Sequence, residues 1–159
     1  MYDVTFYFAH HFLEKGDRTI DQMVQAARSG KQNIAEGAAA GNTSKETEIK
    51  LTNVAKASLQ ELLVDYEDFL RVRWLKQWQP DDARLAQTKR ACAAHNDSEY
   101  YRKAMPERSA ETIANIAITL IHQTDWLLNK LIEKLEIQFV ENGGVKEQMT
   151  KARKEYRGY

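Results

Sequence analysis

Histidine and cysteine are the first residues whose types and spacing allow chemistry, because both bind metals. His10 and His11 are adjacent, so on a helix their side chains point roughly 100° apart and do not readily share an ion. Cys92 and His95 are spaced to face the same way, but two ligands make only half of a zinc site. The chain has no Glu-x-x-His pair and no His-Glu-x-x-His motif. The sequence therefore predicts no metal site and no cofactor.

Phosphate binding and acid–base catalysis have no stronger candidates. Neither Gly-x-x-x-x-Gly-Lys-Ser/Thr nor Gly-x-Gly-x-x-Gly occurs. Ser44 and Lys45 stand at an expected helix start, where an anion can bind, but ordinary helix capping explains them more simply. No two carboxylates stand out by their spacing as a general acid and base. We therefore expect a protein that is not an enzyme and has no catalytic residues.

Basic side chains are the remaining candidates, and the partner that they would bind is RNA or DNA. The nine candidates are Arg28, Lys31, Lys45, Lys56, Arg71, Arg73, Lys151, Arg153 and Lys154. The chain as a whole has 23 basic and 23 acidic residues and no formal net charge, which argues against coating of nucleic acid by bulk charge. A single copy is expected to bind weakly, and an oligomer more strongly, because phosphate contacts add up.

The composition favours a single cytoplasmic domain. A chain of 159 residues suits one core. Cys92 is the one cysteine, so no intrachain disulfide can form, and the start of the chain does not resemble a signal peptide. The longest apolar stretch, residues 113–131, is interrupted by polar side chains, so no membrane span is expected.

Apolar residues recur at helical spacing in four segments, and none of them has a credible partner strand. The expected helices cover about residues 2–15, 18–39, 44–78 and 109–141. Thr43 is the expected N-cap of the third, with Glu46 completing a capping box. The last helix has an apolar stripe broad enough to contact more than one neighbour, with Leu127 and either Ile137 or Gln138 among its core positions. The predicted fold is all-α, an up-down antiparallel four-helix bundle over residues 1–142.

Two segments fall outside this bundle. Residues 80–106 are expected to form an excursion with a short helix between the third and fourth long helices. Residues 143–159 form a basic suffix, which is either a short amphipathic helix with Val145, Met149, Ala152 and Tyr156 on one face or a flexible arm.

A hairpin of the second and third helices that turns near Gly41 would place Gln25 near Ser58 and Arg18 near Glu61 or Asp65. We hypothesise that Arg18 pairs with one of these two carboxylates and fixes the register; solvated surface charges are the alternative. Small residues on both helices would let them approach closely.

Residues 21–37, DQMVQAARSGKQNIAEG, resemble the signature of four-helix-bundle proteins first noticed as products of intervening sequences in bacterial 23S ribosomal RNA genes. Residues 55–62, AKASLQEL, resemble the second block of that family. The resemblance covers residues 2–73 well and the last helix by pattern only. It implies an up-down bundle that assembles into a ring, often a homopentamer. One branch, the accessory variability protein of diversity-generating retroelements, implies a reverse transcriptase and nucleic acid as partners.

The hairpin and the family blocks together mark eight structural or interface positions. These are Arg18, Ser29, Gly30, Asn33, Glu36, Gly37, Ser58 and Glu61. Packing explains Asn33 and Glu36 poorly, so they bond either to the following loop or to a neighbouring subunit or ligand. The chain departs from short family members in the 81–106 excursion, the 143–159 tail and its neutral charge. Two functions stay open, an accessory factor that binds nucleic acid or protein, and a purely structural homo-oligomer.

Overall fold

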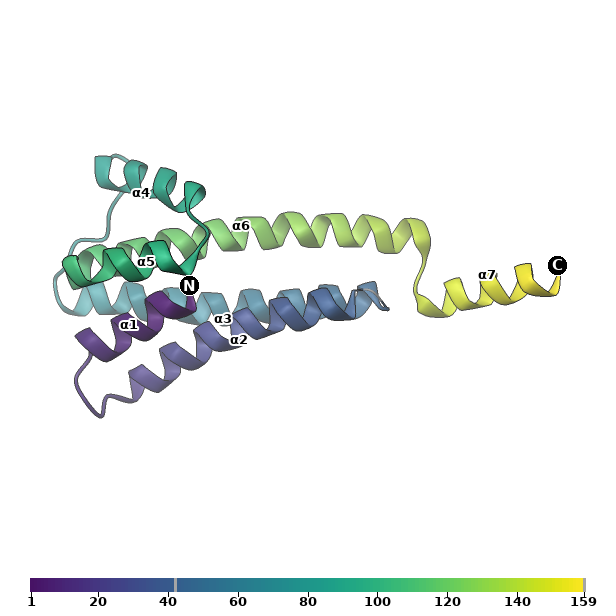
Figure 1. Ribbon diagram of the computed structural model, residues 1–159, viewed down its shortest axis with the longest axis horizontal. Helices are drawn as coiled ribbons and strands as arrows, with labels where there is room; N and C mark the ends of the chain where they lie inside the picture. Colours follow the sequence, from purple (N-terminus) through teal and green to yellow (C-terminus); the bar gives the residue numbers. More distant parts are fainter. Residues whose placement is uncertain (42, 159) are drawn as a thin grey trace.

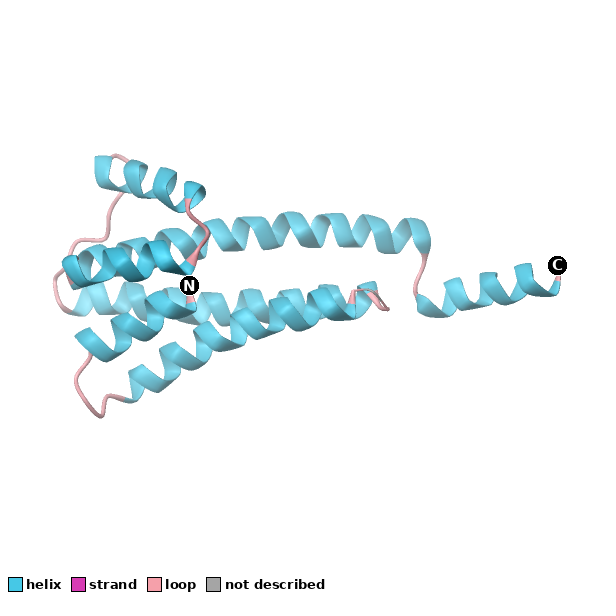
Figure 2. Cartoon of the chain, in the orientation of Figure 1, coloured by secondary structure: helices cyan, strands magenta, loops and turns pink. Residues whose placement is uncertain are grey.

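The computed structural model describes residues 1–41 and 43–158, and within these ranges it is all-helical, which confirms the predicted fold class (Figure 2). The elements are α1 (Tyr2–Phe12), α2 (Arg18–Ala40), α3 (Lys45–Val72), α4 (Ala83–Ala94), α5 (Ser98–Ala104), the 3-10 helix η1 (Met105–Glu107), α6 (Ala110–Asn142) and α7 (Val145–Arg157).

Local sequence sets where most of these helices begin. A side chain at the N-cap accepts a hydrogen bond from the first turn in α2 (Asp17), α3 (Ser44), α4 (Asp82), α5 (Asp97) and α6 (Ser109). Such a cap contributes about 1 kcal/mol. The predicted cap of the third helix is wrong by one residue, because the Ser44 hydroxyl accepts from the Thr47 N–H while Thr43 donates its hydroxyl to the Ala40 carbonyl.

Two helices are shorter than predicted. α1 ends at Phe12 and not at residue 15, because Leu13 is already extended (φ −98°, ψ 150°). α3 ends at Val72, six residues before Trp78. Its end is set by Trp74, which has a φ of +56°, and by the Leu75 N–H, which donates 2.9 Å back to the Leu70 carbonyl. Residues 75–79 then run as a loop toward α4.

α1, α2, α3 and α6 contribute to one apolar core (Figure 1). Tyr66 and Phe8 are its largest fully buried side chains, with their ring centroids 4.9 Å apart. The Tyr66 hydroxyl donates 3.0 Å to the hydroxyl of Thr5, which satisfies the polar end of the ring inside the core. Burial of each such ring contributes roughly 1.5–3 kcal/mol, so these contacts hold α1 against α3.

The four core helices differ greatly in length. α1 has 11 residues, whereas α2, α3 and α6 have 23, 28 and 33. At 1.5 Å per residue α1 spans about 16 Å and α6 about 50 Å. Figure 1 shows α1, α4 and α5 at one end of the molecule, where α1 and α4 contact α6 and α5 contacts α1. The other end consists of α2, α3 and the second half of α6.

Residues 80–106 contain α4 and α5, joined by a loop at His95 and Asn96, so the excursion holds one helix more than predicted. For residues 143–159 the sequence allowed either a short amphipathic helix or a flexible arm, and the structure has the helix, α7. α7 lies beyond the end of the other helices and has no buried residue (Figure 1).

Candidate functional site

The two sequence blocks of the hairpin meet at a small polar contact. The hydroxyls of Ser29 and Ser58 lie 2.9 Å apart, and the Asn33 amide donates to the Ser29 carbonyl at 2.9 Å and to its hydroxyl at 3.3 Å. Asn33 therefore bonds back to its own helix and not to the following loop. The Ser29–Ser58 contact ties α2 to α3, which gives three of the marked residues a structural role.

Gly30 and Gly37 let the helices approach closely, as the small residues predict. A Cβ atom added at Gly30 would lie 3.3 Å from Cδ2 of Leu59, and one at Gly37 would lie 3.4 Å from the Glu48 carbonyl oxygen. A Cβ at Gly30 would require the Leu59 side chain to shift slightly, whereas one at Gly37 would just fit in van der Waals contact.

The hairpin register differs from the predicted one by about one helical turn. Ser29, and not Gln25, faces Ser58. The reason is that α2 continues to Ala40 and α3 begins only after Ser44, so the chain reverses beyond Gly41.

This register removes the predicted pairing of Arg18 with Glu61 or Asp65. Among the described residues Arg18 takes part in no ion pair. Burial and the neighbouring carboxylates of Asp68 and Glu61 instead raise the pKa of Asp65. Arg18, Glu36 and Glu61 are exposed.

The nine basic candidates do not form one patch. Five of them already have a contact inside the chain. Lys45 pairs with Glu48 (3.0 Å), Arg71 pairs with Asp68 (2.5 Å), Lys56 bonds to Asn129, Arg73 lies over Phe69 (4.1 Å to the ring centroid) and Lys31 lies over Tyr2 (5.2 Å). Arg28 is exposed on α2, and Lys151, Arg153 and Lys154 are exposed on α7. Figure 1 places α7 and the end of α3, with Arg71 and Arg73, at opposite ends of the molecule.

Trp74 is a surface residue that falls inside the helix predicted over residues 44–78 but lies beyond the end of α3 in the structure. It is 95% exposed, and it has the one positive φ among the described non-glycine residues. A left-handed conformation costs an L-residue about 1–2 kcal/mol. An aromatic side chain held in solvent on a strained backbone, next to Arg73, is typical of a binding residue. The neighbouring arginines were the available signal in the sequence.

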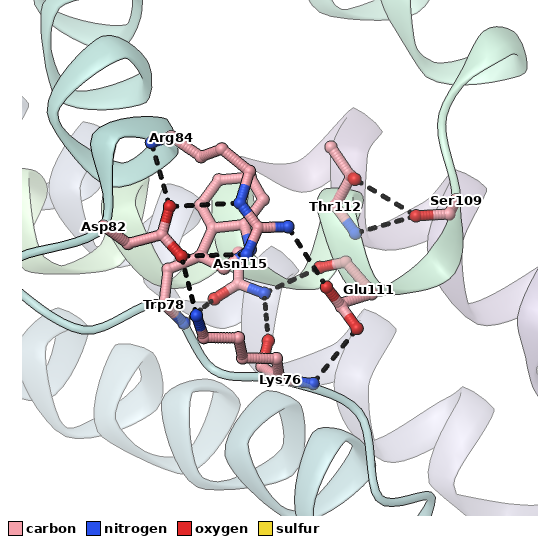
Figure 3. A network of polar contacts seen from close by, with 8 residues as sticks. All are labelled: Lys76, Trp78, Asp82, Arg84, Ser109, Glu111, Thr112 and Asn115. Atoms are coloured by element: carbon pink, nitrogen blue, oxygen red, sulfur yellow. Dashed lines mark hydrogen bonds and ion pairs between the residues drawn. The ribbon is translucent and has the colours of Figure 1, made fainter.

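The loop after Trp74 is fastened to α6 by a polar network (Figure 3). Asn115, which is 3% exposed, accepts from the Trp78 N–H at 2.8 Å and donates to the Lys76 carbonyl at 2.9 Å. On the surface above it, Arg84 pairs with Asp82 (2.8 Å) and Glu111 (3.6 Å). The Asp82 carboxylate accepts hydrogen bonds from the side chain and backbone N–H of Arg84 and from the Lys76 side chain. These hydrogen bonds hold the pKa of the Asp82 carboxyl well below its usual range.

A groove of about 820 Å³ lies between α4 and α6 beside this loop. Its apolar wall includes Trp78, Leu85, Ile118, Trp126 and Leu127. The Trp78 indole N–H is buried and has no hydrogen-bond partner among the described residues. A groove of this size suits a small apolar molecule or a side chain of a partner.

Beyond the groove, apolar side chains continue along the uncovered half of α6. Trp126, Ile137 and Val140 share a helical face and are 60%, 59% and 82% exposed. Leu127 and Ile137, each 59% exposed, are therefore wrong as core positions, whereas Gln138, the alternative to Ile137, is half-buried. Leu128, Ile132 and Leu135 form the buried side of this half of α6, and Leu127 faces the groove beside α4. We call Trp126, Ile137 and Val140 the α6 apolar row.

α7 carries a second apolar surface. Val145, Met149, Ala152 and Tyr156 lie on one face of the helix, and all are exposed. We call these four residues the α7 stripe. None of residues 1–41 and 43–158 buries the α7 stripe or the α6 apolar row.

Across residues 1–41 and 43–158, no three His, Cys, Asp or Glu side chains gather as metal ligands. None of the described helices is both long and apolar enough to cross a membrane. The fold and its surfaces thus define an all-helical protein with uncovered apolar faces at one end. The chain matches no protein-family model, no curated protein and no solved structure.

Proposed function

We propose that this protein is a non-enzymatic helical binding module that assembles with copies of itself. The observation that carries the proposal is the α6 apolar row, three large side chains exposed on the face of α6 that points away from Leu128, Ile132 and Leu135 of the core. Large apolar side chains exposed on one helical face favour an interaction site, and here the exposed ion pair of Lys130 and Glu133 (2.8 Å) lies between Trp126 and Ile137. Covering these side chains is favourable by roughly 25 cal/mol per Å² of apolar area removed from water.

The resemblance to the 23S ribosomal RNA intervening-sequence family supports self-assembly. It implies a four-helix bundle of α1, α2, α3 and α6 and a ring, often a homopentamer. The Ser29–Ser58 contact and the close approach at Gly30 lie within the two resembling blocks, so both blocks serve the α2–α3 hairpin. The proposed assembly is a homo-oligomeric ring in the cytoplasm, with a reverse transcriptase as a further protein partner suggested by the retroelement branch.

Sedimentation velocity of the full chain and of the double variant Ile137→Glu/Val140→Glu tests this proposal. Both side chains are exposed, so the change leaves the monomer folded and introduces charge only into the contact. The unmodified protein is expected to sediment as an oligomer, and the variant as a monomer. Val64→Glu is the matched control, since Val64 is 53% exposed on the outer face of α3. Loss of the oligomer in the control as well, or its persistence in the double variant, would contradict the proposal.

Nucleic-acid binding is the second candidate, and Trp74 favours it. An exposed indole beside the guanidinium groups of Arg71 and Arg73 offers a base-stacking surface next to phosphate contacts. The stacking of one base on an aromatic side chain contributes about 1–3 kcal/mol. The lack of net charge limits the affinity of one copy, while a ring would present several such sites.

Titration with a fluorescent single-stranded RNA at two salt concentrations tests this second function. Trp74→Ala is expected to weaken binding about 10-fold or more, as loss of one stacked base predicts. Phe6→Ala is the control, because Phe6 is also an exposed aromatic residue but lies on α1, outside the α6 apolar row and the α7 stripe. Equal weakening by both variants, or the absence of binding at low salt, would exclude this site.

A further inference from the structure

We propose that α7 is an exchanged arm, in which the α7 stripe of one copy packs on the α6 apolar row of a second copy. This inference rests on the proposed self-association and names the surface and segment that form it. The two surfaces belong to the same end of the chain, and both are uncovered in the single copy (Figure 1).

α7 needs a partner to be a stable helix. It has 13 residues and no buried side chain. An isolated helix of this length is marginal in water, and most helical stability in proteins comes from packing of an apolar face. The stripe provides such a face, with Met149 50% and Tyr156 94% exposed. The stripe from Val145 to Tyr156 is about 16 Å long, and the row from Trp126 to Val140 about 21 Å.

The charges around the two surfaces are opposite. Residues 125–142 carry the acids Asp125, Glu133, Glu136 and Glu141 against the bases Lys130 and Lys134. α7 carries Lys146, Lys151, Arg153, Lys154 and Arg157 against Glu147 and Glu155.

The opposite charges also lie beside the apolar contacts. Glu136 lies one helical turn from Val140, and Glu133, which pairs with Lys130 (2.8 Å), lies one turn from Ile137. On the arm, Arg153 lies one turn from Met149 and Tyr156. Apolar contact between the row and the stripe would therefore bring opposite charges together at the rim.

The junction between α6 and α7 directs the arm to another copy. Gly143 has a φ of +71°, and Glu147 at the start of α7 accepts a hydrogen bond from the Gly144 N–H, which fixes the direction in which α7 leaves α6. α7 then points away from its own α6 (Figure 1). One copy thus offers an arm and an acceptor surface that differ, which is a head-to-tail arrangement, and such an arrangement forms a ring when the rotation between copies closes.

Charge reversal with rescue tests the arm exchange. One variant, Glu133→Lys/Glu136→Lys, changes the acceptor, and another, Arg153→Glu/Arg157→Glu, changes the arm. Each alone is expected to weaken self-association at least 10-fold in sedimentation equilibrium at low salt, and the chain with all four changes is expected to regain it. Arg153→Lys/Arg157→Lys keeps the charge and is the control that should associate normally.

The outcomes separate the arm from self-association in general. An unmodified protein that is monomeric would refute the proposed self-association itself. An oligomer that survives deletion of residues 145–159 would refute only the arm exchange, as would charge reversal without rescue. The arm exchange would also be refuted if α7 bound anionic vesicles or RNA while the arm variants left the oligomer unchanged. The α7 stripe would then contact a membrane or RNA and not a second copy.

Discussion

Asn115→Ala is the sharpest test of how the loop after α3 is held. The side chain is almost fully buried, and it makes hydrogen bonds with the backbone of Trp78 and Lys76, both about 37 positions earlier in the chain. Alanine would leave the buried Trp78 N–H and the half-exposed Lys76 carbonyl without partners. A buried donor or acceptor without a partner costs about 1–3 kcal/mol, and an exposed one much less.

We therefore expect Asn115→Ala to lower the free energy of unfolding by about 2–3 kcal/mol, one full penalty and part of a second. Urea unfolding followed by circular dichroism measures this change. Asn53→Ala is the control, since Asn53 is exposed and donates only to Ile49 of its own helix (3.1 Å), and its cost should stay within about 0.5 kcal/mol. A loss at Asn115 no larger than at Asn53 would refute the reasoning that Asn115 fastens the loop.

The remaining predictions concern single side chains. Tyr66→Phe removes the hydroxyl that donates to Thr5 in the core and should cost about 1 kcal/mol in urea unfolding. Asp65→Asn should stabilise the protein at pH 7 and have no effect at pH 3. The folded state raises the pKa of Asp65, so the penalty exists only above the unfolded pKa, where the carboxyl is ionised; an equal effect at both pH values would contradict this cause. Trp74→Gly should raise the free energy of unfolding by at most about 1 kcal/mol, and with it the melting temperature, because glycine adopts the positive φ without strain. An unchanged or lower melting temperature would argue against strain at this position.

The sequence predicts helices well where the signal is local. Asp17, Ser44 and Ser109 cap helices within one residue of their predicted starts, because a side chain and the N–H groups beside it decide a cap. The end of α3 was predicted too late because neither glycine nor proline precedes Pro80 in that segment. What ends the helix is Trp74 in a left-handed conformation and the attachment of the following loop to Asn115, far along the chain.

Burial was harder to predict than helicity. Ile137 is apolar and close to the predicted core stripe, but the buried side of α6 is formed by Leu128, Ile132 and Leu135, and Ile137 points away from them. Periodicity reports which residues share a face and says nothing of whether a neighbour covers that face. The hairpin register was also hard to predict from periodicity. Whether Ser29 or Gln25 contacts Ser58 depends on the position of the turn after α2, and a shift of that turn by one or two residues changes the partner.

The mass of the unmodified protein in solution tests the central claim most directly. One chain has a mass of 18.4 kDa. Native mass spectrometry, supported by light scattering at micromolar concentration, is expected to give one closed assembly whose mass is a whole-number multiple of that value, five times for the ring that the resemblance implies. A single species at 18.4 kDa over the whole concentration range would show that the uncovered faces of α6 and α7 do not join copies of this chain.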